Sequence, residues 1–200
     1  DIHVATAAAV LQRSPDDIDD DARQLGKVVN FATFAGQGAS ALALQLGVEP
    51  AEAKTLIRRF FERYSVTRTW LDAQLDHAKE HGWVPTIAGR RWRIRDLQSL
   101  EPRDLAYGER LAKRGGPEGS VADVTRRGLL RADQALRTAG LAAAPLVQIH
   151  DEVLFAVPEA ELAEAARIAS EAMVTAFALT VPLRVSRKAG PTWADLDPLD

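Results

Sequence analysis

The sequence predicts an α+β fold, in which a mostly helical first half precedes a half with an antiparallel β-hairpin, packed helices and a final strand. Good helix formers in residues 2–81 occur in segments that end at glycine or proline, which is typical of successive short helices. Later in the chain, two β-prone apolar runs, Pro145–Ile149 and Val153–Val157, flank a short polar triplet. Two such runs with a short polar interruption predict a β-hairpin.

Local stop signals divide the first half into helices. Gly36, Gly47 and Gly82 each follow a helical pattern where glycine commonly ends a helix, and Pro50 suits a first helical turn. We therefore expect helices at about residues 2–12, 20–35, 39–46, 50–64 and 66–81.

A second, shorter hairpin is expected next, because Ala88-Gly89 separates the β-prone runs Trp83–Ile87 and Arg90–Ile94. A helix should follow over Pro102–Arg114. The segment Gly115–Ser120 contains Gly-Gly-Pro and predicts a break, after which another helix runs to about residue 138.

The end of the chain is expected to hold one more helix and one more strand. Apolar residues at helical spacing predict a buried stripe made of Leu162, Ala166, Ala169, Met173 and Phe177. The β-prone stretch Val181–Ser186 predicts the final strand. The change in predicted structure places a boundary near residue 105 and divides the chain into 1–105 and 106–200.

Composition is that of a folded globular protein of 200 residues, with 46% hydrophobic and 26% charged residues. The absence of cysteine excludes disulfides, thiolate zinc sites and a cysteine nucleophile. No apolar run approaches the ~18 residues that a membrane-spanning helix needs, so no membrane segment is predicted. His77 and His81 form an i, i+4 pair without a third ligand nearby, which favours a structural role at a helix end. Because the chain opens with Asp-Ile-His, we expect it to be a piece of a longer protein.

Charge is segregated along the chain, although the net charge is only −3. Residues 87–114 hold eight Arg or Lys against four acids, whereas residues 150–180 hold six acids and one Arg. Solvated surfaces explain both segments. A basic segment beside an acidic one also suits a cleft that holds a polyanion on one wall and a metal ion on the other.

Two groups of residues point to chemistry. The His-Asp-Glu triplet at 150–152 places two adjacent carboxylates where they repel one another unless a cation or solvent meets them. It is either a solvated hairpin tip or a site for a divalent metal ion that carries a phosphate. Arg23, Lys27 and Phe31 recur every four residues and share one helix face. That face is either solvated or able to grip a triphosphate and stack on a base or sugar.

Five motifs follow one another along the chain. They are Asp1-Ile2-His3-x-x-Thr6-Ala7, Arg23-x-x-x-Lys27-x-x-Asn30-Phe31-x-x-x-x-Gly36, Thr86-x-x-Gly89-Arg90-Arg91, Glu109-Arg110 with Gly119-x-x-Ala122-Asp123, and Gln148-Ile149-His150-Asp151-Glu152. In this order and spacing they resemble family A DNA polymerases of the bacterial DNA polymerase I type, over nearly the whole chain. The resemblance implies that residues 1–105 form a fingers subdomain and residues 106–200 the C-terminal part of a palm subdomain.

The resemblance also implies roles for individual residues. Arg23 and Lys27 would hold the phosphates of an incoming deoxynucleoside triphosphate, with Lys27 also taking part in catalysis, and Phe31 would pack on its sugar and base. Asp151 would bind catalytic Mg²⁺ ions, with Glu152 as a supporting catalytic carboxylate. Contacts to primer–template DNA are implied for Arg90, Arg91, Arg110, Gln148 and His150.

The implied reaction is attack of a primer 3′-hydroxyl on the α-phosphate of a deoxynucleoside triphosphate by two-metal catalysis. The implied cofactor is Mg²⁺, the partners are primer–template DNA and deoxynucleoside triphosphates, and the location is the bacterial cytoplasm; the oligomeric state stays open. The family's other metal-binding motif, Asp-x-Ser-x-x-Glu-Leu-Arg, does not occur in this sequence, so we expect its aspartate upstream of Asp1. We also expect the acidic tip at residue 151 to face the row 23, 27 and 31 across an open groove.

Three positions depart from the family's pattern. Ala35 stands where the family has a tyrosine that stacks at the templating position, Arg114 replaces an asparagine, and Glu118 replaces a glutamine. A carboxylate at position 118 repels DNA where an amide donates to it. These departures favour an alternative, a catalytically degenerate DNA-binding module or scaffold. The lost stacking at Ala35 favours a third hypothesis, a distributive repair or translesion enzyme.

Overall fold

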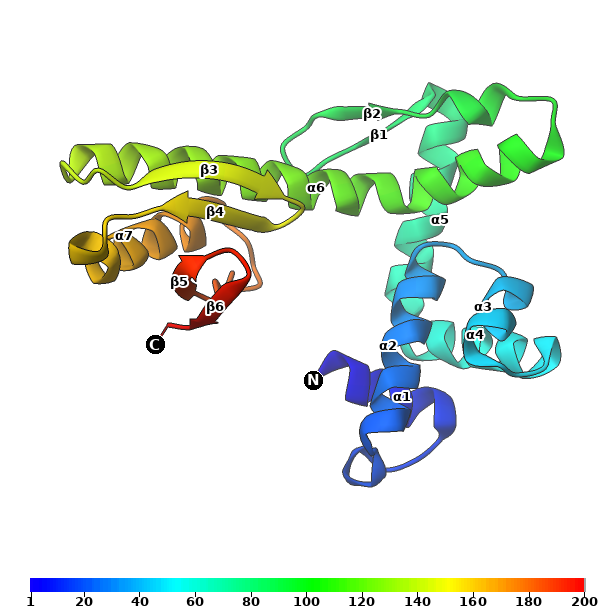
Figure 1. The fold of residues 1–200 in the computed structure, drawn as a ribbon. Helices are drawn as coiled ribbons and strands as arrows, with labels where there is room; N and C mark the ends of the chain where they lie inside the picture. The colour runs from blue at the N-terminus through cyan, green and yellow to red at the C-terminus, as the bar shows by residue number, and fades with distance from the viewer. Residues whose placement is uncertain (200) are drawn as a thin grey trace. The chain divides into compact units, whose positions relative to one another are not determined.

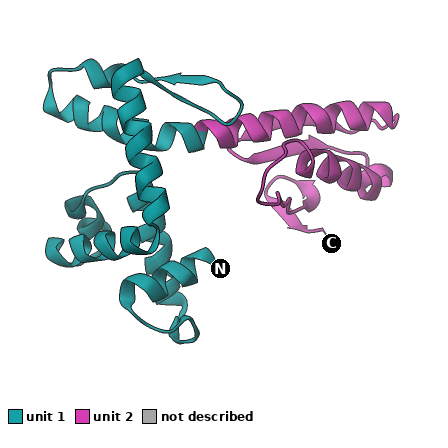
Figure 2. Ribbon diagram, turned by 180° about the vertical axis from the view of Figure 1, so that it is seen from behind, with its two compact units in different colours: residues 1–118 teal, residues 119–200 magenta. Residues whose placement is uncertain are grey.

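The computed structural model of the protein describes residues 1–199, and the chain divides into two compact units, Asp1–Glu118 and Gly119–Asp200 (Figure 2). Helices dominate, and the described strands form three two-stranded antiparallel sheets, so the predicted α+β class is confirmed. The elements (Figure 1) are α1 (Ile2–Leu11), η1 (Pro15–Asp17), α2 (Asp20–Phe34), α3 (Ala39–Leu46), α4 (Pro50–Arg63), α5 (Ser65–His81), β1 (Trp83–Pro85), β2 (Arg91–Arg93), η2 (Arg95–Gln98), α6 (Pro102–Thr138), β3 (Ala144–Ile149), β4 (Glu152–Ala156), η3 (Glu159–Glu161), α7 (Leu162–Val174), β5 (Lys188–Thr192) and β6 (Asp195–Pro198). The functional boundary near residue 105 stays a prediction.

Helices α1 to α4 pack together in the first unit, and each begins and ends at local signals. Asp1 and Asp19 cap α1 and α2 with their carboxylates, Gly47 ends α3 in the left-handed conformation, and Pro50 opens α4. The buried core between these helices consists of Val10, Val29, Ala32, Leu42, Ala43, Ala53, Leu56 and Phe60. The predicted helices are therefore confirmed to within one or two residues at their ends.

A close approach of α1 to α2 occurs at Gly26. A Cβ atom at this position would lie 2.2 Å from the carbonyl oxygen of His3 and 2.9 Å from the backbone nitrogen of Ala7. Only a residue without a side chain permits this spacing. The approach fixes the start of α1 against the middle of α2.

A second core joins α5, the first hairpin and the beginning of α6, and consists of Ala78, Val84, Ile94 and Ala112. The hairpin is shorter than predicted, with Trp83 paired to Arg93 and Pro85 to Arg91. His77 and His81 both pack against the Trp83 ring, at centroid distances of 4.6 Å and 6.0 Å, in agreement with a structural role at the end of α5.

The predicted break at Gly115–Ser120 is wrong, because α6 is one continuous helix of 37 residues with Pro117 inside it. An interior proline removes one backbone hydrogen bond and crowds the carbonyl one turn earlier, but the two glycines before it allow close packing that offsets this cost. A Cβ at Gly115 would lie 3.2 Å from Cγ2 of Val84, and one at Gly116 would lie 3.2 Å from the carbonyl oxygen of Pro85. The glycines are where α6 meets the first hairpin, and packing outweighs their local tendency to end a helix.

The second unit contains the later part of α6, the β3–β4 hairpin, α7 and the β5–β6 pair. Its core consists of Leu136, Ala143 and Ala165. In the hairpin, Ile149 pairs with Glu152, which leaves His150 and Asp151 as the two turn residues. The predicted central hairpin is confirmed, with its polar triplet at the tip.

Two predictions for the end of the chain are wrong. Val181–Ser186 forms no strand, and the closing strands are β5 and β6 instead. Within residues 1–199 the strands pair in three two-stranded sheets, none of which includes this stretch, and β-propensity alone does not reveal this. The predicted helix is present as α7, and Ala169 of the predicted stripe packs against the core. The helix ends at Val174, however, so Phe177 lies beyond it, and its fully buried residue is Ala165, which the stripe did not include. No helix among the described residues has the length and apolar content needed to cross a membrane.

Candidate functional site

The solvent-facing side of α2 carries the three residues that the sequence placed on one face. Gly26, Val29 and Ala32 turn the opposite side of the helix toward the interior. Arg23 keeps 42% of its side chain exposed, Lys27 is exposed, and the Phe31 ring is 64% exposed. Arg23, Lys27 and Phe31 are therefore all open to solvent on this face of the helix.

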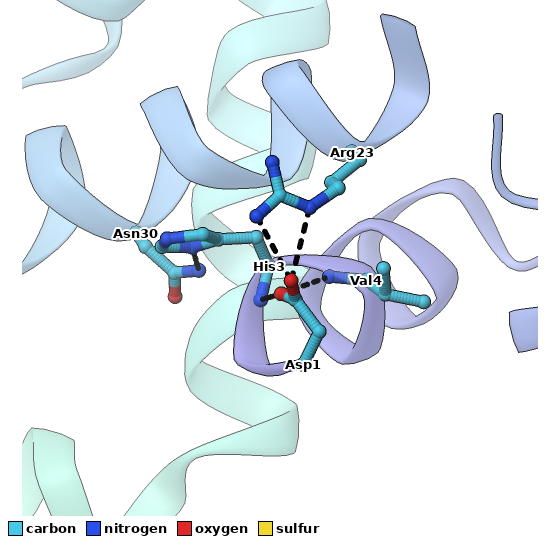
Figure 3. Close-up of polar contacts among 5 residues, drawn as sticks. All are labelled: Asp1, His3, Val4, Arg23 and Asn30. Carbon is cyan, nitrogen blue, oxygen red and sulfur yellow. Dashed lines mark hydrogen bonds and ion pairs between the residues drawn. The ribbon is translucent and has the colours of Figure 1, made fainter. Parts of the chain in front are cut away.

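The first residue of the chain orients Arg23 (Figure 3). The carboxylate of Asp1 accepts from Nε of Arg23 at 2.9 Å and lies 2.9 Å from Nη2. Its other oxygen accepts from the backbone N–H groups of His3 at 2.7 Å and Val4 at 3.3 Å. One carboxylate therefore caps α1 and holds the guanidinium of α2 in place.

His3 adds a fourth residue to this face, which residue spacing along α2 did not reveal. Its Nδ1 lies 3.0 Å from Nδ2 of Asn30, and its ring centroid lies 6.0 Å from that of Phe31. Thr6 donates to Oδ1 of Asn30 at 3.0 Å, which turns the amide nitrogen of Asn30 toward His3. The available signal was the Asp-Ile-His motif at the start of the chain.

The environment of His3 favours the neutral form of its ring. Burial, followed by the positive charges of Arg23 and Lys27, lowers the pKa of His3 below its ordinary value of 6.5. Because the Asn30 amide donates to Nδ1, the proton of the neutral ring sits on Nε2. The face of α2 thus presents two cations, one imidazole donor and one apolar ring.

The acidic tip of the β3–β4 hairpin belongs to the second unit. His150 adopts a left-handed conformation with φ of 52°, which is uncommon for a residue other than glycine. Gln148 donates from Nε2 to the backbone oxygen of His150 at 3.1 Å and thereby braces the turn. Asp151 and Glu152 are both exposed beyond it.

The donor set at the tip fits Mg²⁺ in part. Carboxylate oxygens are ligands that this hard cation prefers, and it commonly keeps water and substrate phosphates in its remaining positions. Among residues 1–199, however, no three His, Asp or Glu side chains gather into a metal site. Asp151 and Glu152 can therefore supply one side of a coordination shell.

The arginines predicted to contact DNA lie in the first unit, on α6 and the first hairpin. A Cβ at Gly36, just after α2, would lie 3.5 Å from Cγ of Arg110, so this residue sits at the C-terminal end of α2. Arg91 stacks over the Trp83 ring at 4.7 Å, and Arg90 is exposed at the end of the hairpin turn. Of these three arginines, Arg110 is thus the one with a recorded approach to the end of α2.

The two departures on α6 lie next to each other. Nε of Arg114 is 3.7 Å from Oε1 of Glu118, and both side chains are partly exposed. The charge of the Glu118 carboxylate is therefore partly balanced by the Arg114 cation one turn away. The expectation that Asp151 faces Arg23, Lys27 and Phe31 concerns residues of different units, and it stays a prediction.

Comparison with known proteins places the chain in one family. The model of DNA polymerase family A matches residues 1–195. DNA polymerase I of Chloroflexus aurantiacus is 35% identical over 200 residues, which cover 100% of this chain and 21% of that protein. The thermostable DNA polymerase I of Thermus thermophilus is 33% identical over 193 residues, covering 96% of this chain and 23% of that protein.

A solved structure gives the same result. The POL domain of Pol1 from M. smegmatis, in complex with DNA primer–template and dNTP, has a TM-score of 0.86 and 32% sequence identity, and the match covers 92% of this chain and 32% of that one. The chain thus spans between a fifth and a third of the proteins it matches. On the family match and these relatives, the chain belongs to DNA polymerase family A.

Proposed function

We propose that this chain is a portion of a template-directed DNA polymerase, which binds the incoming nucleotide and contributes part of the DNA-binding surface. The polymerase would transfer nucleotides from deoxynucleoside triphosphates to a primer 3′-hydroxyl. The observation that carries the proposal is the row Arg23, Lys27 and Phe31 on the exposed face of α2, with His3 beside it. Membership of DNA polymerase family A supports the same activity.

The polar end of this row suits a triphosphate. Asp1 engages Nε and Nη2 of Arg23, so we assign Nη1 to a phosphate oxygen. The ammonium of Lys27 supplies a second charge, and Nε2 of His3 supplies a neutral donor. Phosphoryl transfer depends mainly on such positioning and charge neutralisation, since the protein forms no covalent bond with the substrate.

Phe31 forms the apolar end of the row. Its ring is 64% exposed, so a sugar and base that lie over it remove apolar surface from water. This burial contributes roughly 1–2 kcal/mol to nucleotide binding. Four residues along α2 from Lys27, the ring lies at a distance that one nucleotide can span from its phosphates to its base.

We assign metal binding to the tip of the β3–β4 hairpin. Carboxylates at this tip would hold a Mg²⁺ ion, and the ion would supply charge neutralisation to phosphoryl transfer. Asp151 would bind it directly, with Glu152 in support, while Gln148 keeps the turn in its strained conformation. We propose that a second carboxylate comes from a part of the protein outside these 200 residues.

The remaining residues are assigned to DNA. Arg90, Arg91 and Arg110 would contact primer–template phosphates, and Gln148 and His150 would contact the backbone or minor groove near the tip. Contacts of this kind hold DNA without reading its sequence, which suits an enzyme whose specificity comes from base pairing.

A primer-extension assay on the full-length protein tests the proposal. Asp151→Asn keeps the shape of the turn residue and removes its charge, so Mg²⁺-dependent extension should fall on the order of 100-fold or more. Glu159→Gln, at an exposed acid of the neighbouring turn η3, is the matched control and should extend at the wild-type rate. Wild-type extension by Asp151→Asn would exclude this residue as a metal ligand.

A second candidate function is a DNA-binding module that does not extend primers. The observations that favour it are Ala35, which offers no ring to a template base, and the Arg114–Glu118 pair. The same assay separates the two functions, because the binding module would hold primer–template DNA tightly and give no extension with any of the four nucleotides. Replacing Ala35 by tyrosine should change misincorporation if the third hypothesis, a translesion enzyme, is correct.

A further inference from the structure

A basic groove of about 530 Å³ opens on the first unit between α4, the start of α5 and α6. None of the roles proposed above uses it. The residues that matter for its chemistry are Lys54, Arg58, Phe61, Arg68, Asp72 and Lys113.

Positive charge exceeds negative charge in this groove. Four cations line it, and Asp72 is its one lining carboxylate, shared between Arg68 at 3.8 Å and Lys113 at 3.4 Å. Arg58 pairs with Glu62 on the outer surface of α4, and Lys54 is exposed one turn before it. A concave surface with this excess of cations attracts a polyanion.

One aromatic ring, that of Phe61, also lines the groove. The guanidinium carbon of Arg68 lies 5.7 Å from the centroid of the Phe61 ring, and Phe61 itself is only partly buried. Cations that follow a backbone, combined with an aromatic ring, are the features by which proteins hold single-stranded nucleic acid without sequence preference. The volume suits one or two nucleotides, whereas a duplex needs a far wider surface.

Lys113 connects the groove to the nucleotide-gripping helix. A Cβ at Gly36 would lie 3.6 Å from Cδ of Lys113, so the stem of this lysine touches the chain just after α2. Its ammonium reaches 3.4 Å from Asp72 inside the groove. One side chain therefore borders both the C-terminal end of α2 and the groove.

We propose that the groove binds the phosphates of the unpaired template strand beyond the point of nucleotide insertion. This inference rests on the proposed polymerase function, because such an enzyme must hold an unpaired template strand next to the helix that grips the nucleotide. Lys113 would take the first phosphate past α2, and Arg68, Arg58 and Lys54 would take the following ones. The Phe61 ring would support a base of that strand.

The test compares DNA substrates that differ only in the template overhang. Fluorescence anisotropy would measure binding of the full-length protein to one primer–template duplex with a blunt end or with a ten-nucleotide 5′ template overhang. The variants are the double substitution Arg58→Gln/Arg68→Gln and, independently, Lys54→Glu, all at exposed positions on helix surfaces. Arg167→Gln is the matched control, because it also removes an exposed arginine with an i, i+4 glutamate partner.

The wild type should bind the overhang substrate more tightly than the blunt one, and we call this difference in affinity the overhang gain. In both groove variants, affinity for the overhang substrate should fall roughly five- to tenfold, so that the overhang gain is lost. For the double variant, the salt dependence of overhang binding should fall by about 1.4 in log–log slope, since two phosphate contacts are lost. Affinity for the blunt duplex should match the wild type, and Arg167→Gln should retain the full overhang gain. Equal overhang gains in wild type and groove variants would overturn the inference.

Further outcomes distinguish template phosphates from free nucleotide or pyrophosphate as the ligand of the groove, and failure of this inference from failure of the proposed function. Loss of deoxynucleoside triphosphate or pyrophosphate affinity in the groove variants, with the overhang gain intact, would show a site for free nucleotide or pyrophosphate and overturn the template assignment. Wild-type protein that binds no primer–template would refute the proposed function and this inference together. Wild-type protein that extends primers, with variants that keep the full overhang gain, would refute the inference alone.

Discussion

The contact between α1 and α2 gives a prediction with an unusual sign. Alanine is normally favoured over glycine in a helix interior, by about 1 kcal/mol. At Gly26, however, an added Cβ would lie 2.2 Å from the carbonyl oxygen of His3, and this oxygen belongs to the backbone. Helix α1 would have to withdraw by about 1 Å, and overpacking of this kind costs about 1–3 kcal/mol. Gly26→Ala should therefore weaken the docking of α1.

A matched substitution in α6 should behave differently. Gly128 is also buried and helical, but an added Cβ would meet Met173 at 3.4 Å or more, which is ordinary van der Waals contact. Gly128→Ala should be neutral or stabilising by up to ~1 kcal/mol. The same chemical change thus has opposite expected signs at two helical glycines.

Hydrogen exchange measured by mass spectrometry on the full-length protein reads this difference locally. Peptides from α1 should exchange roughly fivefold to 150-fold faster in Gly26→Ala, as a loss of about 1–3 kcal/mol implies. Nucleotide affinity should fall as well, since the displaced carbonyl belongs to His3. Unchanged protection of α1 in Gly26→Ala would refute the reasoning, and so would equal losses in both variants.

Three further perturbations probe the site. Glu118→Gln releases Arg114 from its partner and should tighten primer–template binding about two- to fivefold, whereas Arg114→Asn should weaken this binding. Equal affinities of the two variants for primer–template DNA in an anisotropy titration would contradict the assigned pair. An NMR pH titration should place the pKa of His3 below 6.5, so the contribution of His3 to stability is lost as the pH falls below 6.5. Nucleotide binding should raise this pKa. A pKa above 6.5 in the nucleotide-free protein would be inconsistent with the environment of His3. His150→Gly places a glycine at a backbone position with positive φ and should slow hydrogen exchange of the hairpin by an amount equivalent to ~1 kcal/mol. The same variant should bind DNA more weakly. Unchanged DNA affinity would show that His150 has only a structural role.

Helices α2, α3 and α4 were predictable because their boundaries depend on local chemistry. A left-handed Gly47 and a first-turn Pro50 act within a few residues, and the same physics holds in any context. The exposed face of α2 followed equally from the period of the helix, which separates Arg23, Lys27 and Phe31 from the buried side.

The features that sequence analysis missed depend on distant partners. Gly115 and Gly116 resemble a break until Val84 and Pro85 are found packed against them. Likewise, His3 joins Phe31 only because α1 meets α2 at a glycine more than twenty residues away along the chain. Local propensity does not contain this information.

The stretch Val181–Ser186 illustrates a further limit. Its apolar alternation is typical of a strand, but a strand forms only where a neighbour offers its hydrogen-bonding edge. Within the described residues the closing strands instead pair with each other, and the Thr192 hydroxyl donates to Asp195 at 2.7 Å across their turn. Composition is insufficient to choose between the two segments.

The affinity of the Lys27→Ala variant for a deoxynucleoside triphosphate tests the central claim most directly. The measurement uses the full-length protein on a primer–template whose primer end cannot be extended, with Lys188→Ala on β5 as an exposed lysine control. Loss of one charge-assisted contact should weaken binding by ~1.5–3 kcal/mol, which corresponds to about ten- to a hundredfold in Kd. Lys188→Ala should bind as the wild type does. Wild-type affinity in Lys27→Ala would contradict the claim that the exposed face of α2 grips the triphosphate.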